Sequence, residues 1–370
     1  LAFPGPSLLH FPMGFGKSLT AIAAAHHVWT KIKQKKGKCL VIAPKQVLNN
    51  FKSQISTHSD YSAYRVSAQY IDFQYADFVL VNIESIHHIT QWMKTHQPGL
   101  FDIVVIDESH EFRHTKTKKF AALQNLLLAS DGRKRYITHC WGLSGTPTIN
   151  KTSDVHTLTR LFGSGQKQQY IYLPNDIIDQ QFLALPKVQL FVYLSKDMLP
   201  IYIQLANHLP HNIGKYNVIY KQWDGQLDED EFDELEQVHL SDAIKLTKIL
   251  RTRQICSKAK DKLKFLRKIC DIDPTLVFSE FVDTRLLTNL PTNIAQHGHL
   301  AISHRAFGLG VEITHVSHQV FLDLPWNQAK LAQAIARTHR FGLSHNLAVH
   351  IPLLNPELTV WDKILESPWI

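Results

Sequence analysis

The sequence predicts an α/β protein with two doubly wound parallel-sheet lobes and a helical insertion between them. Short apolar runs of strand length alternate with longer helical segments near the start of the chain, and the alternation returns near its end. The stretch between is mainly helical and contains an acidic run at 228–236. We therefore expect a first lobe at 1–180, a bridging and helical insertion region at 181–258, and a second lobe at 259–370.

The strands of the first lobe are expected to be buried on both faces. Their aliphatic residues follow one another without polar interruption, which is typical of parallel strands covered by helices. The expected strands are 7–11, 39–43, 78–81, 102–107 and 136–143, and the expected helices are 19–31, 46–55, 85–95 and 117–129.

The rest of the chain begins with a different pattern. Residues 187–194 alternate like a strand, and the acidic run is expected to be a solvated loop or helix face. Helices are expected at 196–209, 240–255, 258–269 and 328–338, and strands at 275–279, 300–303, 319–323 and 347–351.

One connection in the second lobe is short for a parallel crossover. Only about twenty residues separate Ser279 from Leu300, fewer than the usual βαβ unit needs. Either the lobe is abbreviated or residues are missing near Pro291–His299, and we favour missing residues. Because the chain starts at Leu1 rather than Met, we also expect a fragment of a longer polypeptide.

The composition favours a polyanionic partner. Among 370 residues, 40 Lys and Arg outnumber 32 Asp and Glu, which gives a net charge of +8. The four cysteines form no CxxC pair, which argues against a zinc ribbon or a disulfide scaffold, and the 22 histidines are interpreted as scattered imidazoles. No apolar stretch reaches membrane-spanning length, so we expect no membrane partner and an intracellular protein.

The first candidate site is a phosphate loop, Gly14-Phe15-Gly16-Lys17-Ser18, between a strand and a helix. Its glycines let backbone N–H groups surround a polyphosphate at the helix N-terminus. Lys17 would reach the β and γ phosphates, Ser18 would ligate Mg²⁺, and Leu19 follows within the ATP site. The full phosphate-loop pattern has Gly where this chain has Phe11, and the alternative is an ordinary glycine-rich turn.

The second candidate site is the acidic end of the strand at 102–107. Asp107 and Glu108 would lie at the carboxyl edge of the sheet, where open α/β sheets bind ligands. Asp107 would hold Mg²⁺ through water, and Glu108 would act as the general base on the attacking water. A strand that simply ends in polar turn residues is the alternative. In this order, the two motifs predict hydrolysis of ATP with Mg²⁺.

Further motifs resemble those of Swi/Snf-type ATPases in helicase superfamily two, and the resemblance covers nearly the whole chain. The segment Leu8–Ser18 looks closer to helicase-like NTPases of large cytoplasmic DNA viruses. The matching segments are Asp107–Arg113, Ser144–Asn150, Lys187–Tyr202, Leu250–Cys256, Gly308–Glu312, Val320–Asn327 and Gln333–Gly342.

The resemblance implies two RecA-like lobes with further site residues. Gly308 and Glu312 would join the ATP site. Arg337 and Arg340 would be arginine fingers. Their i, i+3 spacing would place both on one helix face, from which they could reach phosphate held on the first lobe. Residues that would couple ATP to nucleic acid are His110, Ser144, Gly145, Thr146 and Gln333.

The resemblance also implies contact with nucleic acid, mainly double-stranded DNA, through the phosphate backbone. The candidate residues follow strands of both lobes: Lys45, Ser85, Ser303, Arg305 and Trp326. The basic run 31–38 could also contact phosphates, but we interpret it as a solubilising surface.

The expected function is that of an ATP-dependent DNA translocase. The alternatives are a helicase-like structural subunit with weak ATPase activity and a strand-separating helicase. A larger transcription or remodelling complex is a possible partner, and the expected location is the nucleus or a viral replication or transcription site in the cytoplasm. The preference for duplex DNA, single-stranded DNA or RNA stays open.

Overall fold

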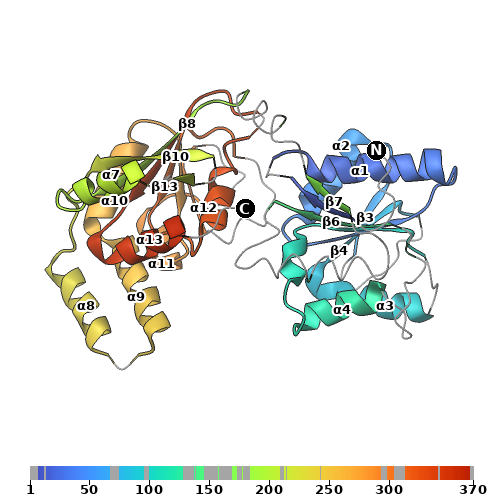
Figure 1. Cartoon of the computed structure of the whole chain (residues 1–370), viewed down its shortest axis with the longest axis horizontal. Coiled ribbons are helices and arrows are strands. Elements are labelled where there is room, and N and C mark those ends of the chain that lie inside the picture. Colours follow the sequence, from blue (N-terminus) through green and yellow to red (C-terminus); the bar gives the residue numbers. More distant parts are fainter. Residues whose placement is uncertain are drawn as a thin grey trace. The chain divides into compact units, whose positions relative to one another are not determined.

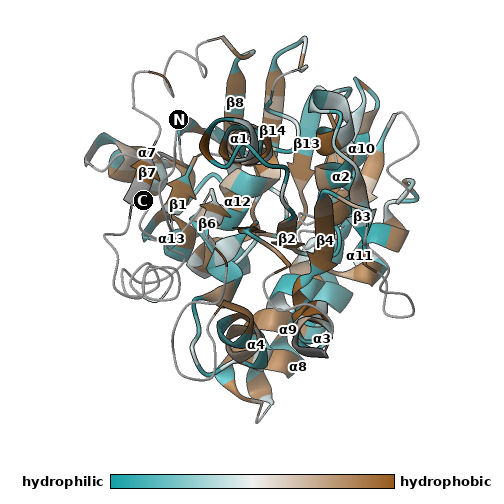
Figure 2. Cartoon of the chain, turned by 90° about the vertical axis from the view of Figure 1, so that its right-hand side faces the viewer, coloured by the Kyte–Doolittle hydropathy of each residue, from teal (hydrophilic) through white to brown (hydrophobic). Residues whose placement is uncertain are grey.

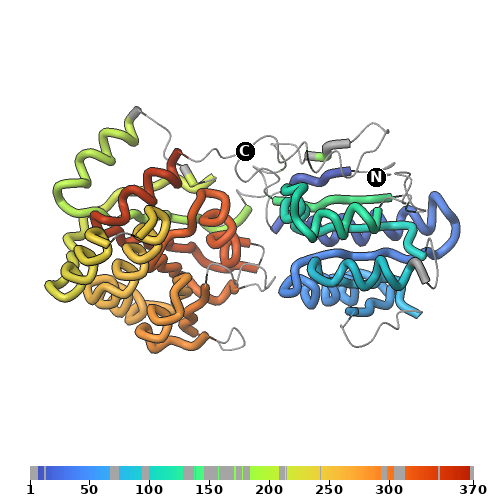
Figure 3. Tube along the Cα trace, turned by 90° about the horizontal axis from the view of Figure 1, so that it is seen from below, coloured from blue at the N-terminus to red at the C-terminus, as the bar shows by residue number. Residues whose placement is uncertain are grey.

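The computed structural model describes residues 7–11, 14–66, 75–95, 100–127, 137, 139–145, 157, 169–172, 177, 184–208, 212–213, 215–241, 243–292, 298–303, 313–340 and 342–366. The chain folds into two compact units, and the division falls between Gln180 and Gln181. The blue-to-green part of the trace forms one unit and the yellow-green-to-red part forms the other (Figures 1 and 3).

The first unit is built on a parallel sheet. Its described strands have the order β3-β4-β2-β5-β6-β1-β7, and every pairing between them is parallel. The strands are β1 (Ser7–His10), β2 (Cys39–Ala43), β3 (Ala63–Arg65), β4 (Phe78–Asn82), β5 (Ile103–Ile106), β6 (His139–Ser144) and β7 (Gln169–Tyr172). The expected sheet is therefore present, with β3 and β7 in addition.

Helices cover both faces of this sheet (Figure 1). Alternate residues of each strand point to opposite faces: Leu9, Val41 and Val105 pack with α1 and α2, whereas Leu8, Ile42 and Val104 pack with α3 and α4. The helical elements are α1 (Lys17–His27), the π-helix η1 (Val28–Ile32), α2 (Leu48–His58), η2 (Ile83–Ser85), α3 (Ile86–Thr95), η3 (Ser109–Phe112) and α4 (Lys118–Leu127). The central strands are brown in Figure 2 because they are apolar on both faces.

The second unit has its own sheet, with the order β12-β11-β13-β14-β8-β10-β9. Only the β9–β10 pairing is antiparallel among its described strands. The strands are β8 (Val188–Leu194), β9 (Asn212–Ile213), β10 (Tyr216–Gln222), β11 (Thr275–Phe278), β12 (Leu300–Ile302), β13 (His318–Phe321) and β14 (Leu347–Pro352).

Helices also pack on both faces of this second sheet. Residues of α12 and α13 share the larger core with the strands, and α10 packs on the opposite face against Val277, Val320 and Leu322. The helical elements are α7 (Leu199–His208), α8 (Glu229–Leu240), α9 (Lys245–Lys258), α10 (Lys260–Cys270), α11 (Val282–Leu287), α12 (Gln328–Ile335), η5 (Asn355–Glu357) and α13 (Leu358–Glu366).

The region expected to bridge the lobes belongs largely to the second sheet. β8 pairs with β14, and β10 pairs with β8, so the sheet takes two strands from residues 181–258. Only α8 and α9 extend away from it, as a helical hairpin (Figure 1). The acidic run is the start of α8, where Asp228 and Glu231 form a capping box. The helix expected at 240–255 begins only at Lys245, because α8 ends at Leu240.

The short connection after Ser279 contains one short helix within the described residues. β11 and β12 are parallel neighbours, and the six-residue helix α11 lies between them in the sequence. The N–H of Ala301 donates to the carbonyl oxygen of Pro291 at 2.8 Å, which joins the connection to the start of β12. Residues 293–297 of this connection lie outside the described residues, so the expectation of missing residues there stays a prediction.

Within the described part of the chain, we find no helix with the length and apolar character needed to span a membrane.

A buried imidazole in the second sheet predicts acid sensitivity. Nδ1 of His350 lies 2.9 Å from the Tyr193 hydroxyl, and Nε2 lies 2.9 Å from Nδ1 of His318. Burial, aided by His318 and Lys221, lowers the pKa of His350 from 6.5 to about 3. The unfolded chain protonates this imidazole below about pH 6.5, whereas the folded protein keeps it neutral. The fold is therefore most stable above that pH with respect to His350, and it loses stability as the pH falls below it.

We expect the free energy of unfolding, measured in urea, to fall by about 2 kcal/mol between pH 7 and pH 5 because of His350 alone. The variant His350→Phe removes the titrating group, so its loss over the same interval should be smaller by about that amount. Equal losses in the two proteins would contradict the assignment.

Candidate functional site

The phosphate loop leads from β1 into α1 through two residues with positive φ. Gly14 has φ 83° and Gly16 has φ 72°, and Gly16 caps the N-terminus of α1. A Cβ atom at Gly16 would meet nothing within 4 Å, so the backbone angle rather than crowding favours glycine there. No acidic residue lies in the first turn of α1. The N-terminal turn of α1 can therefore receive an anion.

Lys17 is the first residue of α1 and folds back over the loop. Its Nζ donates to the carbonyl oxygen of Phe11 at 3.1 Å. The loop is also fastened by Thr20, whose Oγ1 donates to the carbonyl oxygen of Gly16 at 3.0 Å. Ser18 is half-buried, and Leu19 is exposed. These contacts hold a cation beside the N–H groups that would receive phosphate.

Asp107 and Glu108 follow β5 at the same edge of the sheet. β6 separates β5 from β1, so the ends of β5 and β1 are about 10 Å apart. Asp107 is buried, and its Oδ1 accepts from the N–H of Glu108 at 2.9 Å. Glu108 has φ 50° and ψ 47°, a left-handed conformation that is uncommon for a residue with a side chain. The backbone thus turns sharply where the two carboxylates are displayed.

One carboxylate oxygen of Glu108 is buried without a hydrogen bond. Its Oε2 lies 3.2 Å from Nδ1 of His110, but no described residue donates to it with good geometry. Nδ1 of His110 also lies 3.3 Å from Oγ of Ser144, at the end of β6. Burial lowers the pKa of His110 although Glu108 and Glu111 raise it, so the imidazole is neutral at neutral pH. His110 therefore connects the acidic motif to Ser144.

His10 is a site neighbour that the sequence motifs did not include. Burial lowers its pKa, while a backbone hydrogen bond with Gly145 raises it and nearby Lys17 lowers it further. It is the last residue of β1 and pairs in register with Ser144. Its position directly before the loop was the available signal. Thr146 lies outside the described residues.

The expected oxygen ligands have the chemistry that suits Mg²⁺. Ser18 offers a hydroxyl and Asp107 a carboxylate, both hard donors. Among the described residues, no group of three or more His, Cys, Asp or Glu side chains could hold a metal ion by itself.

The two predicted arginine fingers do not share a helix face. α12 ends at Ile335, and Arg337 and Arg340 lie in the turns that follow. The expected helix at 328–338 was therefore too long. The cause is the buried pair after Arg337: Thr338 Oγ1 accepts from Gln319 Nε2 at 2.7 Å, and His339 contacts the Tyr216 hydroxyl at 2.9 Å. These anchors hold the chain in tight turns.

The remaining predicted residues lie after strands, on α12 or outside the described residues. Lys45 is exposed after β2, and Ser85 is half-buried after β4, the neighbouring strand. Ser303 follows β12, and Gln333 lies on α12. Trp326 follows β13 and is 38% exposed. Arg305, Gly308 and Glu312 lie outside the described residues.

The basic run at 31–38 is partly committed to ion pairs within the first unit. Nζ of Lys33 lies 2.8 Å from Asp102, and Nζ of Lys36 lies 2.9 Å from Asp77. These two ammonium groups already have acidic partners, which fits a surface role better than phosphate binding.

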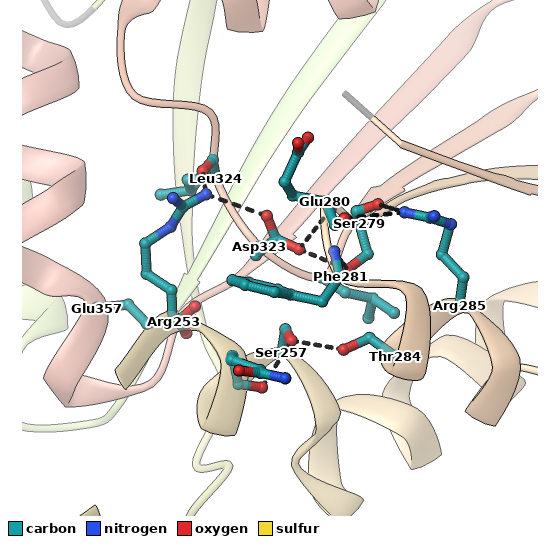
Figure 4. Close-up of polar contacts among 12 residues, drawn as sticks. Arg253, Ser257, Ser279, Glu280, Phe281, Thr284, Arg285, Asp323, Leu324 and Glu357 are labelled. Atoms are coloured by element: carbon teal, nitrogen blue, oxygen red, sulfur yellow. Dashed lines mark hydrogen bonds and ion pairs between the residues drawn. The ribbon is translucent and has the colours of Figure 1, made fainter. Parts of the chain in front are cut away.

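A buried cluster in the second unit was also missed by the sequence motifs. Arg253, on α9, contacts Asp323 after β13, and Asp323 in turn contacts Ser279 after β11 (Figure 4). No local signal marked Arg253 as buried, because polar residues, Thr252 and Gln254, flank it in the sequence.

Two family descriptions match separate parts of the chain. Residues 7–178 match the SNF2-related domain, and residues 289–342 match the helicase conserved C-terminal domain. The first unit is therefore similar to SNF2-related domains, and part of the second unit is similar to helicase C-terminal domains.

Known proteins resemble the chain at low identity. An uncharacterized ATP-dependent helicase, YqhH of Bacillus subtilis, is 20% identical and covers 98% of this chain and 74% of its own length. The DNA repair protein rad8 of Schizosaccharomyces pombe is 23% identical over 50% of this chain, which is 17% of rad8. The chain thus spans only a small part of rad8.

Solved structures resemble its fold. The helicase domain of Pyrococcus furiosus Hef has a TM-score of 0.56 at 13% identity, covering 97% of this chain and 95% of that one. The Sulfolobus solfataricus SWI2/SNF2 ATPase core in complex with double-stranded DNA has a TM-score of 0.41 at 18% identity, covering 95% of this chain and 84% of that one. The likeness to the Hef domain confirms the predicted pair of RecA-like, parallel-sheet lobes.

The left-handed backbone of Glu108 predicts a gain in stability when its side chain is removed. Glu108→Gly should raise the free energy of unfolding by roughly 0.5–1 kcal/mol, since glycine relieves the strain but loses more entropy on folding. Glu108→Gln keeps the strain and should leave stability nearly unchanged. Urea unfolding of the three proteins measures this, and a less stable glycine variant would argue against strain at this position.

Proposed function

We propose that the chain is an ATP-dependent DNA translocase, which hydrolyses ATP to ADP and phosphate while it follows the backbone of duplex DNA. The observation that carries the proposal is the common sheet edge of the first unit. Lys17, Asp107 and Glu108 lie there at the ends of β1 and β5, and His110 connects the acidic motif to Ser144. The similarity to SNF2-related and helicase C-terminal domains supports the same activity.

The first unit would bind the phosphates of ATP. The N–H groups of residues 14–18 surround the polyphosphate, and Lys17 exchanges the carbonyl oxygen of Phe11 for a phosphate oxygen. Ser18 and Asp107 would hold Mg²⁺, which neutralises charge on the phosphates when bound. The buried Oε2 of Glu108 is free to accept a proton from the attacking water as its oxygen bonds to the γ-phosphorus and ADP leaves.

The second unit would complete the reaction. Arg337 and Arg340 stabilise the charge that develops on the γ-phosphoryl group, and Gly308 and Glu312 contribute to the ATP site. Since the arginines follow α12 in a turn, their presentation depends on the anchors Thr338 and His339.

Nucleic-acid contact would be coupled to hydrolysis through the strand ends. A change at Glu108 reaches Ser144 through His110, and Gly145, Thr146 and Gln333 are proposed to extend the coupling. Lys45 and Ser85 would contact the DNA backbone from the first unit. Ser303, Arg305 and Trp326 would contact it from the second. The positive net charge favours such contacts.

Two other functions use the same fold. A structural subunit with weak ATPase activity would keep the lobes without efficient turnover, and a strand-separating helicase would add a wedge to the motor. The complete set Lys17, Asp107, Glu108, Arg337 and Arg340 favours the motor. We further propose that Leu8–Ser18 resembles the corresponding segment of viral helicase-like NTPases. The chain would act within a transcription or remodelling complex, located in the nucleus or at a viral replication or transcription site.

Steady-state ATPase measurements with duplex DNA, single-stranded DNA and RNA test the proposal. We expect duplex DNA to stimulate turnover most.

Lys17→Ala should abolish hydrolysis because it removes the ammonium beside the phosphates. Glu108→Gln should still bind ATP, measured by equilibrium binding, while turnover stops because an amide cannot accept the proton of water. Turnover of Lys17→Ala within tenfold of the parent protein, or no response to any nucleic acid, would count against the motor.

The arginines should act on rate rather than on binding. Arg337→Ala and Arg340→Ala should each lower kcat roughly 10³-fold with little change in KM for ATP, because fingers act on the transition state. Arg337→Lys should recover little, since a single ammonium cannot replace the planar fork. The loss should persist at saturating DNA. Full recovery on adding DNA would instead assign these arginines to DNA binding.

A further inference from the structure

One indole stands out of a loop that is otherwise packed into the second unit. Residues 322–325 after β13 are buried, whereas Trp326 is 38% exposed. The loop is fixed where it meets α12, because the side chain of Asn327 accepts from the N–H of Lys330 at 2.9 Å. The indole is therefore carried on a rigid support.

A buried arginine lies against the face of this indole. Arg253 comes from α9 and is 2% exposed, and its guanidinium carbon lies 4.3 Å from the centre of the Trp326 ring. The same guanidinium donates to the Asp323 carboxylate at 3.1 Å and to the carbonyl oxygen of Leu324 (Figure 4). Arg253 thus contacts three residues of one loop, including the exposed one.

The carboxylate partner is itself held by the neighbouring strand. Oδ2 of Asp323 accepts from the Ser279 hydroxyl at 2.6 Å and from the N–H of Glu280 at 3.1 Å (Figure 4). A buried ion pair contributes little net stability because both charges lose water. Its directional hydrogen bonds do fix where the guanidinium lies, and hence where the indole lies.

We infer that Arg253 is a positioning residue, which holds Trp326 in place as a stacking platform for nucleic acid. The inference rests on the proposed function, in which Trp326 contacts DNA. The guanidinium covers one face of the ring, so the exposed surface of the indole is available to a base or a sugar. Stacking on an aromatic face does not read sequence, which agrees with tracking of the backbone.

Positioning has a measurable consequence for affinity. An indole that is already immobile loses little side-chain freedom when nucleic acid binds. Ordering one such side chain on binding weakens the affinity roughly 2- to 10-fold. Arg253→Lys keeps a cation opposite Asp323 but loses the planar fork that contacts both the carboxylate and the ring.

The test compares the DNA concentration that gives half-maximal ATPase activity in four proteins: the parent, Arg253→Lys, Trp326→Ala and the double variant. We expect Arg253→Lys to raise this concentration roughly 2- to 10-fold without changing kcat at saturating DNA. The effect should vanish when Trp326 is already Ala. Arg251→Lys is the matched control: it makes the same change at an exposed arginine of the same helix, so DNA affinity should stay unchanged.

Several outcomes would overturn the inference. They are an unchanged affinity in Arg253→Lys, an equal loss in the presence and absence of the indole, and a fall in kcat at saturating DNA. If Arg253→Lys does not fold, Arg253→Met with Asp323→Asn removes both charges together and allows the same comparison with and without Trp326. A parent protein that ignores nucleic acid would reject the proposed function and this inference together. DNA-stimulated turnover without an Arg253 effect would reject only the inference.

Discussion

Parallel pairing brings the carboxyl ends of the strands to one edge in each unit, and the candidate chemistry depends on that edge. A parallel strand must be covered on both faces, so its apolar residues are committed to the two helix layers. Polar residues are then confined to the points where strands end. In the first unit Asp107 follows β5, Ser144 ends β6, and the loop after β1 leads to Lys17 at the start of α1. In the second unit these points carry Ser279, Ser303 and Asp323 on β11, β12 and β13.

Burial at these edges decides the state of the charged groups. His110 lies between two carboxylates, which would favour its protonation, yet desolvation keeps its pKa low. A neutral imidazole carries no charge that would pair with Glu108, which suits the proposed role of this residue as general base. Arg253 and Asp323 are also buried, but both stay charged because each has an oppositely charged partner. In the proposed mechanism, the first arrangement leaves the Glu108 carboxylate able to accept a proton, whereas the Arg253–Asp323 pair fixes a loop.

The accuracy of the sequence predictions follows from how local each signal was. Strands such as Cys39–Ala43 and helices such as α1 were predicted because continuous apolar runs and unbroken helical segments need no distant partner to be recognised. β10 was missed because its apolar run, Val218–Tyr220, is only three residues long, and the strand is stabilised by pairing with β8, which comes earlier in the chain. The end of α12 was placed three residues too late because Thr338 and His339 have partners far away in the sequence.

The sequence by itself determined the two parallel-sheet lobes and the residue types at the phosphate loop and the acidic strand end. Both follow from short-range rules, since apolar patterning specifies the strands and glycine permits the left-handed turn at Gly16. The tertiary structure decided which side chains contact one another. Whether His110 meets Ser144, and whether Arg253 meets Asp323 and Trp326, depends on the order of strands in a sheet and on desolvation. These are properties of the packed chain, because residues far apart in the sequence become neighbours only when the strands pair and exclude water.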